Sequence, residues 1–283
     1  MKFEELFSNS FQHLRAAFQT SEQLLQPMVG KMLSTDSRFC REAVAAGLMS
    51  PEGMQRAAQR YLLGRSRSNE TVFWMIDERQ RVRDGMVGDS WASVLLKERG
   101  IIDRQWCPQH CLFGLHLISH TDLTDLTDYS YTQTSCDRQK SVLGHTDYTD
   151  FTDHYSAQTS CDSQKSVQSV RSVCDKTICV VESVRSCVVL SERFPKYLWM
   201  ATGYLANLNE RMFLPLKGHR VVCFPATDPT GDTYLLWLSV AKEARKYGID
   251  ITVSRLLEDQ ASPKQKEQCV DLLEFLYNTN LQK

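Results

Sequence analysis

The sequence lacks a long hydrophobic run and any strong excess of charge. Its 283 residues contain 33 Lys and Arg against 34 Asp and Glu, which gives a formal net charge of −1. A chain with this balance does not bind nucleic acid through bulk positive charge. No stretch approaches the ~18 apolar residues of a membrane-spanning helix. The first ten residues, MKFEELFSNS, carry acids where a secretory signal carries basic residues. We therefore expect a cytoplasmic protein that makes no membrane contact.

Several common catalytic and nucleotide-binding motifs are also missing. The chain contains no phosphate-binding GxxxxGK[ST] loop, no dinucleotide-binding GxGxxG and no nucleophile elbow. It does contain ten cysteines, but Cys136 and Cys161 are copies of one repeated position, and Cys179, Cys187 and Cys223 lie within apolar runs. Because thiols stay reduced in a cytoplasm, we expect free cysteines and no disulfide framework.

Residues 119–176 contain very few large aliphatic side chains and a duplication. The stretch HTDLTDLTDYSYTQTSCDRQKSV, which begins at His120, returns at His145 with 16 of its 23 positions unchanged. Such a segment buries too little apolar surface to offset its ordering entropy, and two copies are fewer than the ~3 that a stable repeat array needs. We expect a disordered insertion. The alternative, a cation site at the repeated Thr-Asp pairs, lacks the glycines of calcium loops.

The residues before this insertion fall into two parts. Apolar residues at three- and four-residue steps predict helices over residues 1–68, one of which starts at Ser50-Pro51. Residues 69–118 predict a small strand-rich module, in which a short polar turn joins two strands. The expected strands are Thr71–Asp77 and Arg81–Arg83, and the expected helix is Ser90–Arg99.

Residues 177–283 alternate between short apolar runs and helical patterns. This alternation predicts an α/β fold, in which helices cover both faces of a parallel sheet. The expected strands are Ile178–Val181, Tyr197–Thr202, Arg220–Phe224 and Ile249–Leu256, and the expected helices are Val184–Arg193, Asn207–Phe213, Asp232–Tyr247 and Ser262–Tyr277.

Polar residues follow three of these expected strands. Glu182 follows the first, Thr202-Gly203 the second, and Asp228 with Asp232 the third. Functional groups of an open parallel sheet lie beyond the carboxyl ends of its strands, and carboxylates there can hold a hard cation such as Mg²⁺. Glu182, Asp228 and Asp232 are therefore candidate metal ligands, and Glu182 is a candidate general acid or base. The alternative is that Glu182 and Asp228 only cap the helices that follow.

The three strand ends resemble the Toprim domain, the nucleotidyl-transfer module of topoisomerases and bacterial-type primases. That family has a Glu after its first strand, a Gly after its second and an Asp-x-Asp after its third. Val180-Val181-Glu182 matches the first motif, Ala201-Thr202-Gly203 the second and Ala226-Thr227-Asp228 the third, with Ala226 in place of the first Asp. The resemblance implies a Toprim-like parallel sheet, Mg²⁺ as the cofactor and a metal site weakened by the missing carboxylate.

The resemblance extends upstream of the insertion. Val72–Arg83 is similar to the strand pair that precedes the Toprim domain of primases, and His110–His116 to the segment between them. In their order and spacing these segments resemble an uncharacterised Toprim-like family carried on mobile elements of gut anaerobes. The zinc ribbon of primases is missing. Cys107, His110 and Cys111 form a CxxHC cluster, but a structural zinc site normally has four ligands, so a reduced loop is the preferred interpretation.

Two groups of arginines are candidates for binding phosphate. Arg79, Arg81 and Arg83 alternate along an expected strand, so they share one face and can track single-stranded DNA. The alternative is a solvated strand edge that charge protects from aggregation. Arg185 stands nearest to a Lys of the family's first motif, and we count it with the nucleic-acid-binding residues.

The sequence therefore predicts a nucleic-acid-associated protein that binds single-stranded or primed DNA, with little or no catalysis. Two alternatives remain open. The first is an active Mg²⁺-dependent nucleotidyl transferase, primase-like in character, or a nuclease. The second is a non-catalytic subunit whose N-terminal helices bind replication or mobilisation proteins.

Overall fold

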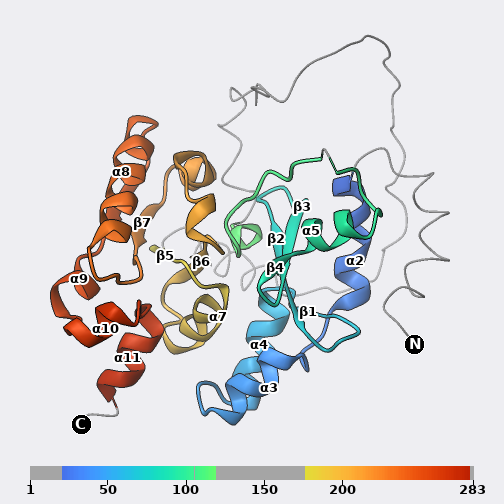
Figure 1. Ribbon diagram of the computed structural model, residues 1–283, viewed down its shortest axis with the longest axis horizontal. Helices are drawn as coiled ribbons and strands as arrows, with labels where there is room; N and C mark the ends of the chain where they lie inside the picture. Colours follow the sequence, from blue (N-terminus) through green and yellow to red (C-terminus); the bar gives the residue numbers. More distant parts are fainter. Residues whose placement is uncertain (1–20, 105, 119–175, 281–283) are drawn as a thin grey trace, which may run out of the picture.

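The computed structural model describes residues 21–104, 106–118 and 176–280, which form two four-stranded sheets with their helices (Figure 1). The first 20 residues, predicted to be helical, and nearly all of the predicted insertion at 119–176 lie outside the described residues. Within the described part, every helix is too short or too polar to span a bilayer. The mixed α/β class predicted from the sequence is confirmed.

Helices α2, α3 and α4 precede the first sheet. The predicted helix start at Ser50 is confirmed, because its hydroxyl accepts the amide of Gly53 at 3.0 Å and Pro51 occupies the first helical position. The helix ends at Arg60, because Leu62 soon after it adopts a left-handed conformation with φ 53°. The bounds are α2 (Ser21–Met32), α3 (Arg38–Ala45) and α4 (Pro51–Arg60).

The first sheet is an antiparallel meander in the order β1-β2-β3-β4. Its strands are β1 (Gly64–Arg65), β2 (Thr71–Ile76), β3 (Val82–Val87) and β4 (Ser90–Trp91). The second predicted strand is longer than Arg81–Arg83 because buried hydrogen bonds allow the polar Asp84 to continue it. Helix α5 (Ala92–Glu98) starts later than predicted, because Ser90 and Trp91 pair with β3.

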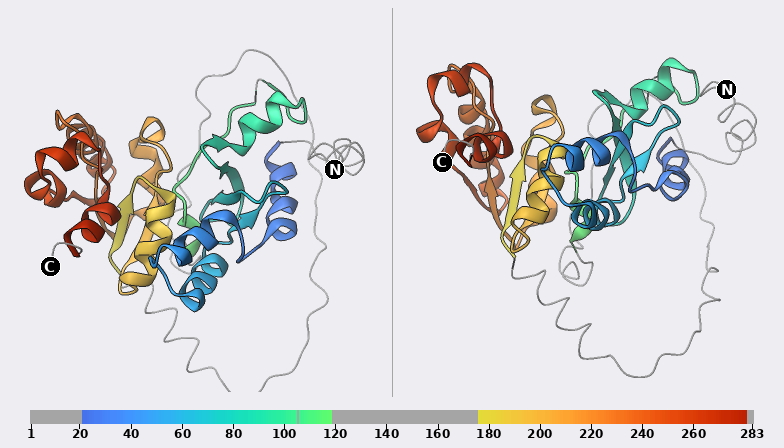
Figure 2. Two further views of the ribbon diagram at one scale, coloured as in Figure 1. Left: turned by 60° about the horizontal axis from the view of Figure 1, so that its bottom comes forward. Right: turned by 90° about the horizontal axis from the view of Figure 1, so that it is seen from below.

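The second sheet is parallel, with the order β6-β5-β7-β8. Its four strands were predicted from the sequence, and their bounds are β5 (Ile178–Val181), β6 (Leu198–Ala201), β7 (Arg220–Cys223) and β8 (Asp250–Val253). Helices α7 (Val184–Arg193) and α11 (Leu272–Asn280) pack on one face, and α8 (Asp232–Lys246) with the 3₁₀ segment η4 (Glu210–Leu216) packs on the other. Figure 2 shows α7 between this sheet and the N-terminal helices.

Two predicted helices of this half are wrong. The predicted helix Asn207–Phe213 is a pair of 3₁₀ segments, η3 (Leu205–Asn207) and η4, the second of which contains Pro215. The predicted helix Ser262–Tyr277 is divided into α10 (Pro263–Glu267) and α11, because Cys269 adopts φ 53° between them. A further short helix, α9 (Leu256–Gln260), follows β8 where a longer strand was predicted.

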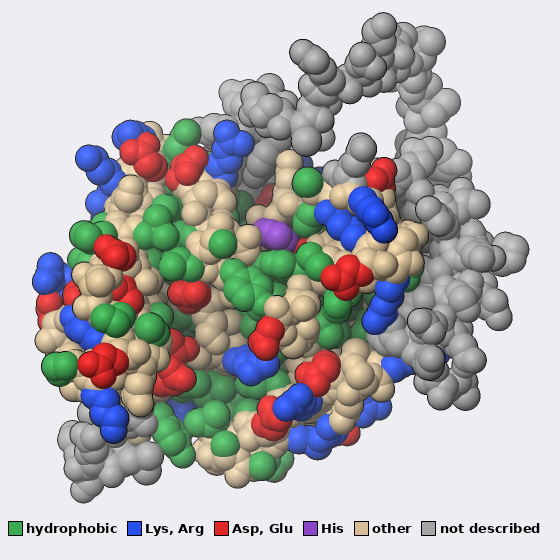
Figure 3. Space-filling model, in the orientation of Figure 1, with side chains coloured by type: hydrophobic (Ala, Val, Ile, Leu, Met, Phe, Trp, Pro, Cys, Tyr) green, Lys and Arg blue, Asp and Glu red, His purple; other side chains and the backbone are tan. Residues whose placement is uncertain are grey.

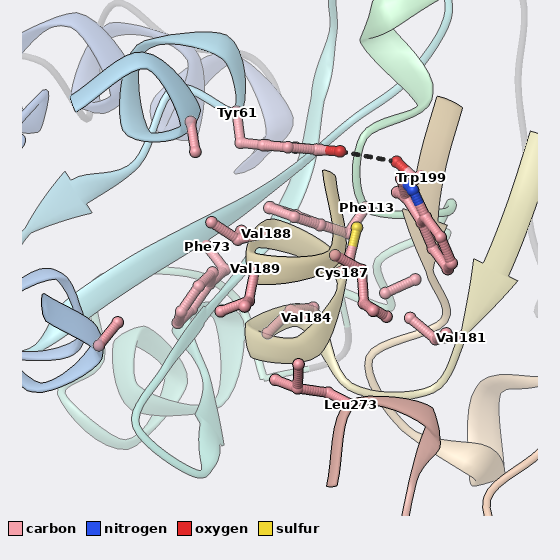
Figure 4. Close-up of a cluster of buried hydrophobic side chains, with 14 of the residues drawn as sticks. Tyr61, Phe73, Phe113, Val181, Val184, Cys187, Val188, Val189, Trp199 and Leu273 are labelled. Atoms are coloured by element: carbon pink, nitrogen blue, oxygen red, sulfur yellow. Dashed lines mark hydrogen bonds between the residues drawn. The ribbon is translucent and has the colours of Figure 1, made fainter. Parts of the chain in front are cut away.

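One buried cluster joins the two sheets (Figure 4). The ring of Tyr61 stacks on Phe113 at 5.0 Å between centroids, and its hydroxyl donates to the carbonyl of Trp199 at 2.9 Å. Phe113 and Ala201 exchange both backbone hydrogen bonds, at 2.8 and 3.1 Å, so Phe113 covers the open edge of β6. The strand-rich module and the parallel sheet therefore share one core.

Candidate functional site

The candidate site lies at the carboxyl ends of β5 and β7, the two central strands of the parallel sheet. The chain runs from β5 to β6 on one side and then crosses to β7 on the other, so the strand order reverses between β5 and β7. Open α/β sheets bind ligands at such a reversal. Glu182 directly follows β5, and Asp228 follows β7 after a short extended segment. The structure thus places both predicted carboxylates at this reversal.

Asp228 caps helix α8. Its Oδ1 accepts the amides of Thr230 and Gly231 at 2.8 and 2.6 Å, and its Oδ2 accepts the amide of Thr233 at 2.7 Å. Although partial burial opposes ionisation, the hydrogen bonds from Thr230 and Thr233 hold the pKa of Asp228 well below its usual range. These bonds favour the capping alternative for this residue, because they engage both of its oxygens.

Asp232, the third predicted ligand, lies in the exposed first turn of α8. Its Oδ2 is 2.7 Å from the hydroxyl of Thr230, which is also 2.7 Å from Oδ1 of Asp228. The two carboxylates are therefore bridged by one hydroxyl, whose single proton can serve only one of them at a time.

Glu182 has a different environment from Asp228. Burial raises the pKa of its carboxyl, the nearby charge of Asp271 raises it further, and a hydrogen bond from the backbone of Leu205 acts in the opposite direction. A carboxyl whose pKa is raised in this way stays protonated to a higher pH than an exposed one. The surroundings of Glu182 therefore disfavour its charged form, whereas those of Asp228 favour it.

Asp271 was not predicted from the sequence, although it lies near Glu182. It begins α11 with a reciprocal capping arrangement, because Asp271 Oδ1 accepts the amide of Glu274 and Glu274 Oε2 accepts the amide of Asp271, both at 3.0 Å. Its second oxygen accepts the hydroxyl of Ser186 in α7. The Asp-Leu-Leu-Glu spacing is a capping signal. The prediction of one continuous helix over residues 262–277 places this motif in the helix interior, so the cap was not predicted.

The described carboxylates at this edge are not gathered into a cluster of metal ligands. Among the described residues, no group of three or more His, Cys, Asp and Glu side chains is arranged to hold a metal ion. Asp228 already accepts several backbone amides, and Ala226 provides no oxygen at the position of the missing acid. Mg²⁺ requires near-octahedral oxygen ligands, and the described side chains do not provide such a set by themselves. Magnesium binding here therefore stays a prediction of the sequence.

A second group of side chains joins this edge to the strand-rich module. We call Trp91, His110, Arg185 and Tyr204 the junction residues. The ring of Trp91 stacks on His110 at 4.0 Å between centroids and meets Tyr204 edge-on at 5.5 Å. Burial and the charge of Asp89 raise the pKa of Tyr204, and the charge of Arg185 lowers it. Asp89 in the β3–β4 turn and Arg185 in α7 therefore both lie close to this phenol.

Gly203 allows the two parts to approach at the junction. It adopts φ 83°, and a Cβ there would lie 2.9 Å from both Met75 Cε and Met86 Sδ and 3.4 Å from Trp91 Cη2. Only glycine combines this backbone conformation with so close an approach at no steric cost. The Gly that the resemblance marked after the second strand therefore has a structural role in this chain.

The predicted arginine edge of the strand-rich module is largely neutralised. Arg81 and Arg83 both donate through Nε to Oδ2 of Asp77, at 2.9 and 2.8 Å. Arg79 lies in the turn before β3, where its Nε is 3.6 Å from Glu78. The three arginines therefore do not form one free row on a strand face, and phosphate binding by them stays a prediction.

On this face of the molecule, side chains of both charges alternate without a large basic patch (Figure 3). A histidine reaches the surface between the two halves, and hydrophobic side chains lie beside it. This distribution agrees with the formal net charge of −1.

Comparison with known proteins identifies only part of the chain. A family model described as a domain of unknown function (DUF6371) matches residues 130–227, roughly a third of the sequence. The matched segment includes β5, α7, β6 and β7, and so contains Glu182, Arg185 and Tyr204, but it ends one residue before Asp228. No curated protein and no solved structure matches the chain.

Proposed function

We propose that this chain is a Toprim-like, nucleic-acid-associated protein that binds single-stranded or primed DNA at the junction residues. The observation that carries the proposal is the meeting of Trp91, Tyr204 and Arg185 next to Glu182, at the reversal point of the parallel sheet. Aromatic rings beside a cation suit single-stranded nucleic acid, because bases stack on the rings and phosphates pair with the cation.

Arg185 is the cation best placed for this role. It is exposed in the first turn of α7, and among the described residues it has no ion pair. By contrast, four arginines between residues 56 and 83 are engaged: Arg56 and Arg60 pair with Glu192, and Arg81 and Arg83 with Asp77. An unpaired guanidinium can bind a phosphate without first losing a protein partner.

Binding of a labelled single-stranded oligonucleotide across a salt series tests the proposal. We expect Arg185→Gln to weaken binding roughly three- to tenfold and to reduce the salt slope by about 0.7, the value for one phosphate contact on a single strand. Arg41→Gln is the matched control. It removes the same charge from α3, where Arg41 pairs with Asp36, and should leave affinity nearly unchanged. Equal effects of both substitutions, or no binding at low salt, would reject the proposal.

A metal-dependent nucleotidyl transferase or nuclease is the second candidate function. The raised pKa of Glu182 favours it, because burial and the charge of Asp271 move the carboxyl towards the pH range in which a general acid or base works. Primer synthesis and strand cleavage would be assayed with Mn²⁺ or Mg²⁺. Activity that is lost in Glu182→Gln, with oligonucleotide binding retained, supports this candidate. Binding that is indifferent to metal and to that substitution supports the non-catalytic proposal.

A further inference from the structure

Asp84 is fully buried in the middle of β3, and both oxygens of its carboxylate have hydrogen-bond partners. Oδ1 accepts the amides of Gly85 and Ser93 at 2.8 and 3.0 Å, and Oδ2 accepts the hydroxyl of Ser93. Nε2 of His110 lies 2.9 Å from the same Oδ2. Both oxygens of this buried carboxylate are therefore hydrogen-bonded, as buried polar groups normally are.

This arrangement determines which nitrogen of His110 carries a proton. An ionised carboxylate only accepts hydrogen bonds, so Nε2 of His110 must be the donor to Asp84. The second nitrogen, Nδ1, is therefore the atom that gains or loses a proton when the ring changes charge. Nδ1 has no hydrogen-bond partner among the described residues, and the side chain is 18% exposed. The ring is thus anchored at one nitrogen and available at the other.

The ring of His110 lies in the junction, next to Trp91. Trp91 of β4 covers one face of the imidazole, and Tyr204 contacts the edge of that Trp91. Two acids and one base act on this region. Asp84 is hydrogen-bonded to the ring at Nε2, Asp89 lies in the turn before β4, and Arg185 lies close to Tyr204. Cys107 and Cys111 are the titratable groups on the segment of His110 itself.

Protonation of His110 changes the charge of the junction by one unit. With a neutral imidazole, the carboxylate of Asp84 has no cationic partner among its hydrogen-bonding groups. With an imidazolium, that charge is balanced, and an N–H of Nδ1 becomes a charged donor. A phosphate oxygen is the ligand that such a donor binds best.

We propose that Nδ1 of His110 is a phosphate contact of the junction, so that binding of a single-stranded nucleic acid takes up a proton. This inference rests on the proposed function and adds a second anion-binding group to Arg185. The buried Asp84 acts as a positioning residue, because it holds the ring through Nε2 and does not itself contact the ligand.

The test compares the affinity for a fluorescent oligothymidylate at about pH 5.5 and pH 8.5 at constant ionic strength. Wild type should bind about tenfold more tightly at the lower pH. His110→Gln keeps an amide N–H that can donate to Asp84 but has no titrating atom, so its affinity should be low and independent of pH. Arg185→Gln should be weaker at every pH and keep the pH dependence of wild type. A His110→Gln protein that keeps the wild-type pH dependence overturns the inference.

A second measurement covers the case in which His110→Gln does not fold. The midpoint for protonation of His110 is followed by NMR in wild type, alone and saturated with the oligothymidylate. Linkage requires the midpoint to move to higher pH, by about one unit for tenfold coupling. An unchanged midpoint at saturation overturns the phosphate contact while the proposed function stands. Absence of binding at any salt or pH overturns the proposed function itself.

Discussion

Asp228 and Glu182 occupy equivalent places after β7 and β5, yet their surroundings act on them in opposite directions. Hydrogen bonds to the amides of α8 hold the pKa of Asp228 low, whereas burial and the charge of Asp271 hold that of Glu182 high. A lowered pKa means that ionisation stabilises the fold, and a raised one means that ionisation destabilises it. Stability measurements therefore separate a structural carboxylate from a functional one.

Asp228→Asn should destabilise the protein by about 1 kcal/mol at neutral pH, the usual cost of losing a helix N-cap. The amide side chain keeps one acceptor but loses the charge and the oxygen that accepts from Thr233. The contribution of the wild-type carboxylate is complete above its unfolded pKa of about 4 and is lost as the pH falls through the lower folded value. The difference in unfolding free energy between variant and wild type, measured from urea unfolding curves, should become smaller below about pH 4. A constant gap down to pH 2 would rule out this account of Asp228.

Glu182→Gln should stabilise the protein at neutral pH or leave its stability unchanged. Ionisation of the half-buried carboxyl opposes folding, and this cost grows as the pH rises from the unfolded pKa towards the raised folded pKa. The advantage of the Gln variant should therefore be absent near pH 4 and present at pH 7. Urea unfolding at both values measures it. Clear destabilisation of Glu182→Gln at pH 7 would show that the carboxylate is structural.

At the scale of elements, the approach of β6 to the strand-rich module depends on Gly203. Gly203→Ala should cost about 1–3 kcal/mol, because an L-residue is strained at φ 83° and the new Cβ meets Met75 and Met86. Gly100→Ala is the matched control. Gly100 adopts φ 66° with no atom within 4 Å of a new Cβ. The loss of unfolding free energy in Gly100→Ala therefore measures only the cost of the backbone conformation. Equal losses of unfolding free energy in both variants would mean that the close approach contributes nothing.

Most elements of the parallel sheet could be predicted, because their sequence patterns are local. The four strands are short apolar runs, and the helices α7 and α8 follow polar caps at Ser183 and near Asp228. The errors occur where tertiary contacts override local patterns. β3 continues through Asp84 because Ser93 and His110 satisfy its carboxylate. No residue within the predicted strand Arg81–Arg83 indicates that contact.

For the candidate site, the sequence predicts Glu182, Asp228 and Arg185 but not what surrounds them. Trp91, His110 and Tyr204 come from three segments far apart in the chain, and only the packing of the two sheets brings them together. The arginines of the strand-rich module show the reverse error. Their spacing predicts a phosphate-binding face, whereas Asp77 engages two of them. Asp77 lies only four and six residues before these arginines, so the hairpin between β2 and β3 forms both ion pairs locally.

At the scale of the whole molecule, the shared core predicts one cooperative unfolding transition. Phe113 belongs to the strand-rich module, covers the edge of β6 and is fully buried in the cluster that also holds α7 and α11. Phe113→Ala should cost about 3–5 kcal/mol, as is usual for a buried phenylalanine. Calorimetry should show a single transition that moves to lower temperature as a whole. Two transitions, only one of which moves, would show that the two sheets unfold independently.

The measurement that tests the central claim most directly is photo-crosslinking of a single-stranded oligonucleotide that contains 4-thiothymidine, followed by peptide mapping of the full chain. Stacking on the junction residues predicts adducts in the peptides that contain Trp91, His110 or Tyr204, and their loss when an excess of unlabelled strand competes. Adducts confined to α2, α3 and α4, or no adduct at a strand concentration that saturates binding, would contradict a nucleic-acid site at the junction of the two sheets.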